Sequence, residues 1–164
     1  MLERDPIREA HRQWVAHGWD EAAAGMAMVT SLTRVHQLLM ERIDDSLRPY
    51  DLTFARFEVL RLLAFTQAGS LRMSRLGSLL QVHPTSVTSA VQRLEGQGFV
   101  TRSRDDLDKR VVRAEITDSG RHVIEPATVA VNAVFADPGV TPADTAKLVE
   151  LLASIRAKAG DPTA

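Results

Sequence analysis

The chain has 164 residues and a mass of 18.1 kDa, with 45% apolar residues, 25% charged residues and a net charge of -1. These values are typical of one globular domain, or of one domain with a helical extension. The absence of cysteine excludes disulfides, thiol nucleophiles and thiolate metal sites. No apolar run approaches the roughly 18 residues of a membrane helix, and the charged N-terminus is unlike a signal peptide. We therefore expect a cytoplasmic protein.

The charges are unevenly distributed along the chain. Residues 51–115 contain ten basic and seven acidic side chains, a net charge of +3, and the rest contains ten basic and fourteen acidic ones, a net charge of -4. A basic middle between acidic flanks indicates a polyanion partner for the middle alone. A difference of a few charges also arises by chance, so charge alone does not identify the partner.

Two helices are predicted in the first 50 residues. Asp5 and Pro6 are typical of a helix start, with an N-cap followed by proline at the first helical position, and Gly18 ends this helix. Apolar residues then recur at spacings of three and four over residues 20–47, which predicts a long second helix. A helix of this length with so apolar a face needs a partner surface.

Three further helices are predicted in the middle of the chain. Thr53 is expected to cap the helix in "LTFARFEVLRLLAFT", and Ser74 the short helix in "LRMSRLGSLLQV". Pro84 starts a third helix, in "HPTSVTSAVQRLEGQGF". A narrow buried stripe on this third helix is predicted from the apolar residues Val87, Val91 and Leu94.

Two strands are predicted near residues 99–103 and 111–116, on either side of the loop "RDDLDKR", which has six charges in seven residues. Thr117 is expected to cap the next helix, which Pro126 is expected to kink. Thr141 then begins a capping box with proline at the first turn, which predicts a last helix.

This order of elements predicts a mainly helical α+β fold, a winged helix-turn-helix with flanking helices. We assign residues 1–50 to N-terminal dimerisation helices and residues 51–117 to the winged helix-turn-helix domain. Residues 118–160 are assigned to C-terminal dimerisation helices, and residues 161–164 to a disordered tail. The flanking helices have no core of their own, which indicates a partner subunit.

The helix predicted near residues 84–95 has a face of short polar side chains. Short hydroxyl side chains allow a helix to lie close in the major groove of DNA, where they bond phosphates and base edges. A merely solvated face usually carries Glu, Lys and Arg, whereas this helix has only Arg93 and Glu95. The alternative is a surface helix with poor helix formers. The candidate major-groove residues are Thr85, Ser86, Thr88, Ser89 and Gln92.

The charged loop could be a solvated hairpin tip, an acidic metal loop or a grip on a polyanion. A calcium loop of the EF-hand type needs oxygen ligands over about twelve residues and a glycine, and this loop has neither. We expect Asp105 or Asp108 to hold an arginine by a carboxylate–guanidinium pair, so that a cation near residues 104–110 enters the minor groove. Arg72 and Ser74 are expected to meet phosphates. The candidate wing contacts are Arg104, Asp108, Lys109 and Arg110, with Asp108 orienting Arg110.

No arrangement of residues in the sequence indicates catalysis. The five histidines lack metal-ligand spacing, the serines and threonines lack an Asp–His arrangement, and no glycine-rich phosphate loop is present. We therefore expect no enzymatic activity, no metal and no cofactor. The remaining alternative is a winged-helix protein-interaction module that does not contact DNA.

The stretch from "LRMSRLGSLLQV" to "ITDSG" resembles the DNA-binding core of the multiple antibiotic resistance regulator (MarR) family. The shared features are the helix pair, "RLEGQGFV" and the wing pattern formed by Arg104, Asp105, Asp108 and Arg110. The resemblance extends over about residues 52–120. It implies a homodimer with interlocking terminal helices and a pseudo-palindromic operator with one recognition helix per half-site. It also implies release from DNA by small, often anionic or aromatic ligands, and we expect a repressor.

The additional N-terminal helix with a tryptophan resembles the urate-responsive members of that family. The ligand contacts of those members fall here on Trp14 and Arg102, and Glu58 stands where they have an aspartate. Ala90 replaces an arginine of their recognition helix. An anionic purine would lose a charge partner there, so we expect a different carboxylate or phenolic ligand, or none.

These residues also have purely structural interpretations. Trp14 is alternatively a packing residue, because aromatic side chains mainly supply buried area. Glu58 is alternatively an ion-pair partner of Arg61 or Arg56. If a ligand binds between the dimer helices and the DNA-binding lobe, it changes the separation of the two recognition helices. Operator binding then falls, because the duplex sets the spacing of the half-sites.

Overall fold

The computed structural model describes residues 5–80, 82–104, 108 and 110–162. The chain is mostly helical with one small antiparallel sheet, which confirms the predicted fold class. No helix of the described residues is long and apolar enough to cross a membrane. In chain order the elements are α1 (Pro6–Ala16), α2 (Asp20–Leu47), the short 3-10 helix η1 (Arg48–Tyr50), α3 (Phe54–Phe65), β1 (Ser70–Arg72), α4 (Met73–Leu80), α5 (Pro84–Gly96), β2 (Val100–Arg104), β3 (Val112–Ile116), α6 (Asp118–Ala136) and α7 (Pro142–Lys158).

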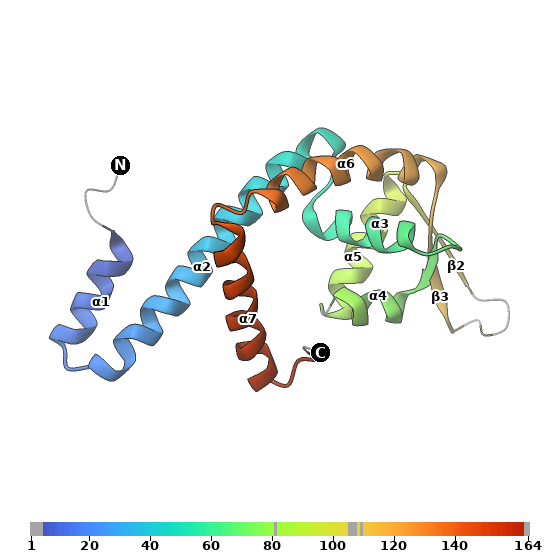
Figure 1. The fold of residues 1–164 in the computed structure, drawn as a ribbon. Coiled ribbons are helices and arrows are strands. Elements are labelled where there is room, and N and C mark those ends of the chain that lie inside the picture. The colour runs from blue at the N-terminus through green and yellow to red at the C-terminus, as the bar shows by residue number, and fades with distance from the viewer. Residues whose placement is uncertain (1–4, 81, 105–107, 109, 163–164) are drawn as a thin grey trace. The chain divides into compact units, whose positions relative to one another are not determined.

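The chain divides into two compact units, Met1–Phe54 and Ala55–Ala164, called unit 1 and unit 2 here. In unit 1, α1 and α2 pack against each other as a helical hairpin (Figure 1). Asp5 caps α1 as predicted, because its carboxylate accepts the N–H of Ile7 at 2.9 Å. The bounds predicted for α2 are also confirmed.

The core of unit 2 is apolar and is shared by its helices and its sheet. Phe57, Leu60 and Leu63 of α3 are buried, as is Ile124 of α6. Full burial of each such side chain stabilises the fold by about 1.5–3 kcal/mol. The stripe predicted on α5 is confirmed as well, with Val87, Val91 and Leu94 at most 2% exposed.

The sheet of unit 2 has three strands in the order β1-β3-β2, whereas the sequence predicts a two-stranded ribbon. β2 and β3 pair from Val100↔Ile116 to Arg104↔Val112. The additional strand β1 pairs with β3, for example at Leu71↔Ala114. The prediction missed β1 because three residues are too few to show the alternating pattern of a strand, and β1 exists only through its pairing with a distant segment.

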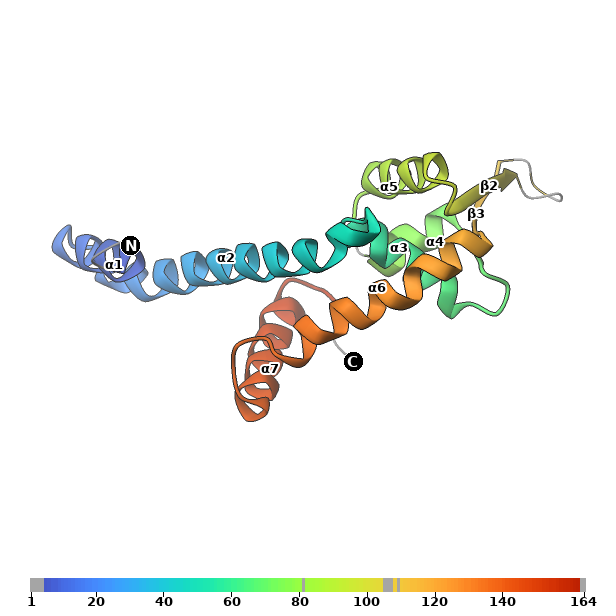
Figure 2. The same ribbon diagram turned by 90° about the horizontal axis from the view of Figure 1, so that it is seen from above.

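The helix α3 lies between α6 and α5 in both views, so α5 is at the outside of unit 2 (Figures 1 and 2). Two arginines of α3 tie it to its neighbours. Arg56 donates from Nη1 to Oε1 of Gln97, just after α5, at 2.8 Å. Arg61 donates from Nη1 to Glu125 Oε1 at 3.1 Å and to Thr128 Oγ1 at 3.2 Å, both on α6. The Arg56 bond helps to set the position of α5, and the Arg61 bonds hold α3 to α6.

The C-terminal helices begin where their caps predict. The hydroxyl of Thr117 accepts the N–H of Gly120 at 3.1 Å, and α6 then continues through Pro126 to Ala136. The hydroxyl of Thr141 accepts the N–H of Asp144 at 3.2 Å. After α7 the chain is held by an ion pair, 3.2 Å from Arg156 Nε to Asp161 Oδ2, and residues 163–164 lie outside the described residues.

The buried Gly120 generates a prediction about stability. A Cβ atom at this position would lie 2.8 Å from Cγ1 of Ile116 and still closer to the carbonyl oxygen of Phe99. Gly120→Ala should therefore destabilise the protein by about 1–3 kcal/mol. The control is Gly25→Ala in α2, where no atom lies within 4 Å of the new Cβ and a gain of about 0.5–1 kcal/mol is expected. Urea unfolding measures both, and a Gly120→Ala variant as stable as the wild type would contradict this packing.

Candidate nucleic-acid interface

The helix α5 is started by a cap that the sequence reasoning did not identify. Pro84 occupies the first turn as predicted, and His83 is the N-cap residue. The Nδ1 atom of His83 accepts the N–H of Thr85 at 3.3 Å and lies 3.0 Å from the Thr85 hydroxyl. Histidine is not among the favoured N-cap residues, so its type gave no signal.

All five residues predicted to enter the major groove are exposed on α5, but their hydroxyl groups differ. Thr88 donates its hydroxyl to the carbonyl of Pro84 at 3.0 Å, one turn earlier. The hydroxyl of Thr85 is engaged by His83. No interaction with a described residue engages the side chains of Ser86, Ser89 and Gln92. These three polar groups are therefore the ones whose full hydrogen-bonding capacity is available to another molecule.

The wing is formed by β2 and β3, which extend away from the helices of unit 2 (Figure 1). Arg104 ends β2 and is exposed, as are Asp108 and Arg110. The carboxylate of Asp108 accepts the backbone N–H of Arg110 at 3.0 Å, and the Asp108 carbonyl accepts the N–H of Val111 at 2.9 Å. Among the described residues no ion pair joins Asp108 to the Arg110 guanidinium, so the predicted side-chain pair is wrong for Asp108. Two other predicted residues, Asp105 and Lys109, lie outside the described residues.

Asp108 nevertheless acts on Arg110, through the main chain. An aspartate whose carboxylate accepts the backbone N–H two residues later forms an Asx-turn, which mimics a backbone turn. The turn sets the direction of the backbone at Arg110 and leaves the guanidinium without that partner. A carboxylate and a guanidinium in one loop are complementary, which is why the sequence predicts a side-chain pair, but the nearby backbone N–H is reached at lower entropic cost.

The first strand of the wing is joined to α5 by an ion pair. Arg102 contacts Oε2 of Glu95 through Nε at 2.8 Å and through Nη2 at 2.5 Å. The two side chains are 32% and 37% exposed. A guanidinium that uses two nitrogens fixes orientation as well as distance. Arg102, predicted as a ligand contact, is thus already paired with the last turn of α5, and the pair couples the helix to the wing.

Arg72 and Ser74 lie beside the helix-turn-helix, and both are exposed. The prediction that Ser74 caps α4 is wrong. The strand β1 leads directly into this helix, which begins at Met73, so Ser74 lies inside it. Ser74 and Thr88 line one groove between α4 and α5, with a volume of about 530 Å³. The groove thus brings Ser74 of α4 and Thr88 of α5 to one surface hollow.

The remaining ligand candidates belong to different units. Trp14 of unit 1 is half-buried and meets Trp19 edge to face. Glu58 of unit 2 is half-buried, and burial raises the pKa of its carboxyl. It forms no ion pair with Arg56 or Arg61, which bond Gln97 and Glu125 instead, so that structural alternative is wrong. Ala90 is 8% exposed and belongs to the buried side of α5.

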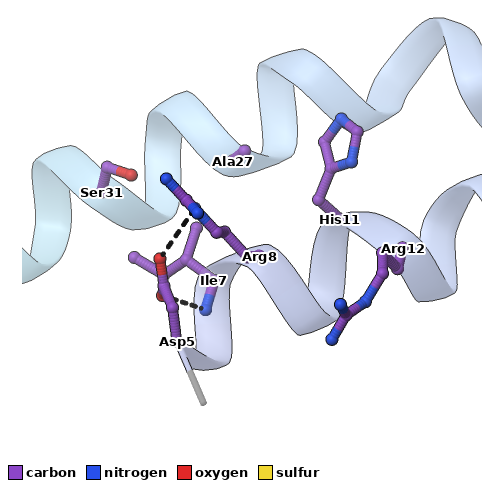
Figure 3. A pocket seen from close by; sticks show the side chains of 7 residues that line it. All are labelled: Asp5, Ile7, Arg8, His11, Arg12, Ala27 and Ser31. Atoms are coloured by element: carbon purple, nitrogen blue, oxygen red, sulfur yellow. Dashed lines mark hydrogen bonds and ion pairs between the residues drawn. The ribbon is translucent and has the colours of Figure 1, made fainter.

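A groove of about 490 Å³ lies between α1 and α2 in unit 1 (Figure 3). Both of its guanidinium groups are paired within α1 or its cap: Arg8 with Asp5 at 3.6 Å, and Arg12 with Glu9. Arg8 extends across the groove toward α2, whereas Arg12 points away from it (Figure 3). No group of three or more metal-ligating side chains occurs in the part of the chain that the structure describes.

Comparisons with known proteins agree with this geometry. The MarR family model matches residues 52–112. The crystal structure of Sco5413, a MarR family transcriptional regulator from Streptomyces coelicolor, is 40% identical with a TM-score of 0.75, over 84% of this chain and 96% of that one.

Two more distant relatives are transcriptional regulators as well. Sco3205, a MarR family regulator from S. coelicolor in complex with DNA, is 26% identical with a TM-score of 0.74, over 82% of this chain and 90% of that one. The transcriptional repressor MdtR from Bacillus subtilis is 28% identical over 65% of this chain and 67% of its own. The chain therefore belongs to the MarR family of DNA-binding transcriptional regulators.

Proposed function

We propose that this protein is a dimeric, ligand-responsive repressor of a pseudo-palindromic operator, with α5 in the major groove and the wing near residues 104–110 in the minor groove. The observation that carries the proposal is the outer face of α5. Ser86, Ser89 and Gln92 are exposed there without a partner among the described residues. A repressor is supported by MdtR, which is named as one.

Each predicted contact has a distinct role in this proposal. Ser86, Ser89 and Gln92 bond base edges or phosphates in the major groove, where an α-helix fits. Thr85 and Thr88 place methyl groups on the same face. The minor-groove group consists of Arg104, Lys109 and Arg110, with Asp108 shaping the turn, and the phosphate contacts are Arg72 and Ser74.

The dimer is supported by apolar surface that one protomer leaves exposed. The 17-residue helix α7 has no buried residue. Its apolar side chains Leu148, Leu151 and Ile155 are each about half exposed to solvent. The exposed apolar side of α2 includes Val29 and Leu32. Such helices gain most of their stability from packing of the apolar face. We therefore assign residues 1–50 and 118–160 to the contact with a second copy, which would set the distance between the two α5 helices.

We also propose that a small ligand controls release from the operator, with Trp14, Glu58 and Arg102 as its candidate contacts. The helix α1 with its tryptophan supports a likeness to the urate-responsive subgroup. Urate itself is disfavoured, because position 90 carries a buried alanine in place of a cation. Burial disfavours the charged form of Glu58 and raises its pKa, and perturbed carboxyls of this kind are common at functional sites.

The wing contact is tested by Arg110→Ala. Loss of one phosphate or minor-groove contact should weaken binding to DNA from upstream of the protein's own gene, and should reduce the slope of log affinity against log salt by about 0.9. Lys147→Ala, which removes one exposed charge from α7, is the matched control. Gel shifts over a range of salt concentrations measure both variants, and unchanged affinity of Arg110→Ala would show that Arg110 does not contact the operator.

Base reading is tested by Ser89→Ala. Loss of this hydroxyl should lower the preference for the operator over unrelated DNA by about 1 kcal/mol. Thr88→Ala is the matched control, because the Thr88 hydroxyl is already bonded to Pro84 and its removal should change the preference less. Competition binding with operator and scrambled duplexes separates the two cases. Equal losses on all sequences would exclude base reading at Ser89.

Glu58→Gln tests the cost of the half-buried carboxyl. Burial raises the pKa of Glu58 in the folded state, so the charged carboxylate is disfavoured there. The folded protein therefore loses stability as the pH rises from the usual carboxyl pKa through the raised value. The amide carries no charge, so the variant should melt at a higher temperature than the wild type at neutral pH. This advantage should shrink as pH falls toward the usual carboxyl range. A lower melting temperature at neutral pH would contradict the desolvation.

A further inference from the structure

We propose that the junction of α1 and α2 binds a small organic cation, of the alkylammonium or arylammonium class, between Trp14, Trp19 and the carboxylates of Asp20 and Glu21. The site uses residues of unit 1 alone, and its ligand is opposite in charge to the anion that the family resemblance implies. Trp14 is also a candidate contact of the ligand in the proposed function, and a cation bound here would replace an anion at that side chain. Cation binding itself does not require operator binding, but its effect on operator affinity rests on the proposed function.

Two indole rings form the walls of the site. The ring centroids of Trp14 and Trp19 are 5.5 Å apart and their planes are inclined by 70°. The backbone supports this corner, because the N–H of Trp19 donates to the carbonyl of Trp14 at 3.0 Å and Gly18 turns the chain at a φ of 78°. His17 stacks on Trp19 at 5.5 Å and 27°. The rings are thus held as a corner, although Trp19 remains 53% exposed.

A surface hollow of about 660 Å³, open to solvent, lies against this corner. This volume is within the usual range of small-molecule sites, about 300–1,000 Å³. Its lining contains two aromatic and two acidic side chains and no lysine or arginine. The lining residues are Trp14, Gly18, Trp19, Asp20, Glu21 and Ala22.

The charge of the lining selects a cation. Asp20 and Glu21 occupy the first turn of α2, and neither carboxylate has a hydrogen bond or ion pair with a described residue. Acidic residues are common in this position because they stabilise the helix dipole, so they alone would not indicate a site. The indole faces supply the independent indication, since they attract an ammonium group electrostatically. Both features favour a cation, and the two carboxylates repel an anion.

The groove between α1 and α2 is a weaker candidate in the same unit. Its two guanidinium groups are already paired with Asp5 and Glu9. It has no aromatic ring other than that of His11. The junction differs because its charged groups have no partner among the described residues and stand beside aromatic walls.

The two tryptophans of the chain are both in this site, so intrinsic fluorescence reports on it without a label. The probe pair is choline and neohexanol, an uncharged isostere in which a tert-butyl group replaces the trimethylammonium group. Choline should give a saturable fluorescence change with an affinity roughly two- to five-fold higher than that of neohexanol. Calorimetry of the full-length protein provides a second measurement of the same binding.

Variants that keep both fluorophores separate charge from shape. Asp20→Asn and Glu21→Gln should each weaken choline binding and leave neohexanol binding unchanged. Glu41→Gln, a charge removal elsewhere on α2, should affect neither probe. Equal affinities for choline and neohexanol, or no loss in either charge variant, would overturn the cation site. Absence of binding in both fluorescence and calorimetry would overturn it as well.

Operator gel shifts with and without choline separate this proposal from the proposed function. A choline-dependent change in operator affinity that is lost in Asp20→Asn would support the site and connect it to regulation. Failure of the protein to bind the operator without choline would overturn the proposed function, whereas the fluorescence result would still decide the site.

Discussion

Burial of Val87, Val91 and Leu94 in the core of unit 2 determines which side of α5 faces outward. A helix has one orientation about its axis that buries all three side chains, and that orientation exposes Ser86, Ser89 and Gln92. The exposed polar surface of α5 is therefore a consequence of core packing. Arg56 of α3 reinforces it from the side by bonding Gln97, directly after α5.

The wing depends on the same helix. The ion pair of Glu95 with Arg102 joins the last turn of α5 to β2, so the direction of the wing follows that of the helix. At the other end of the hairpin, Asp108 shapes the turn through the backbone of Arg110. These two acidic residues in a basic region act as positioning groups: one fixes the strand and the other the turn. Carboxylates in this basic segment thus have a structural role.

The helices outside the winged domain show the opposite balance. The helix α7 buries no side chain within one protomer, and α2 exposes a long apolar side. Their sequences specify helices, but within one chain much of their apolar surface stays exposed. The tryptophan corner between α1 and α2 is different again. It is built by residues close in sequence, and its charge and aromatic character are complete within unit 1.

Most of the fold is determined by the sequence alone, because its signals are local. The caps Asp5, Thr117 and Thr141 and the apolar stripe of α5 each involve residues within one or two turns of each other. Local periodicity and capping are sufficient to predict helices and the buried side of the recognition helix. The polar face predicted for α5 follows directly, since it is the complement of the buried stripe.

Only the tertiary structure decided the features that depend on contacts between elements or on the choice among competing partners. The strand β1 needs its pairing with β3, and Arg102 needs the last turn of α5 to bring Glu95 within reach. Asp108 had a guanidinium and a backbone N–H as alternative partners, and the turn geometry selected the N–H. Sequence reveals which groups are complementary, but distance and backbone direction decide which of them meet.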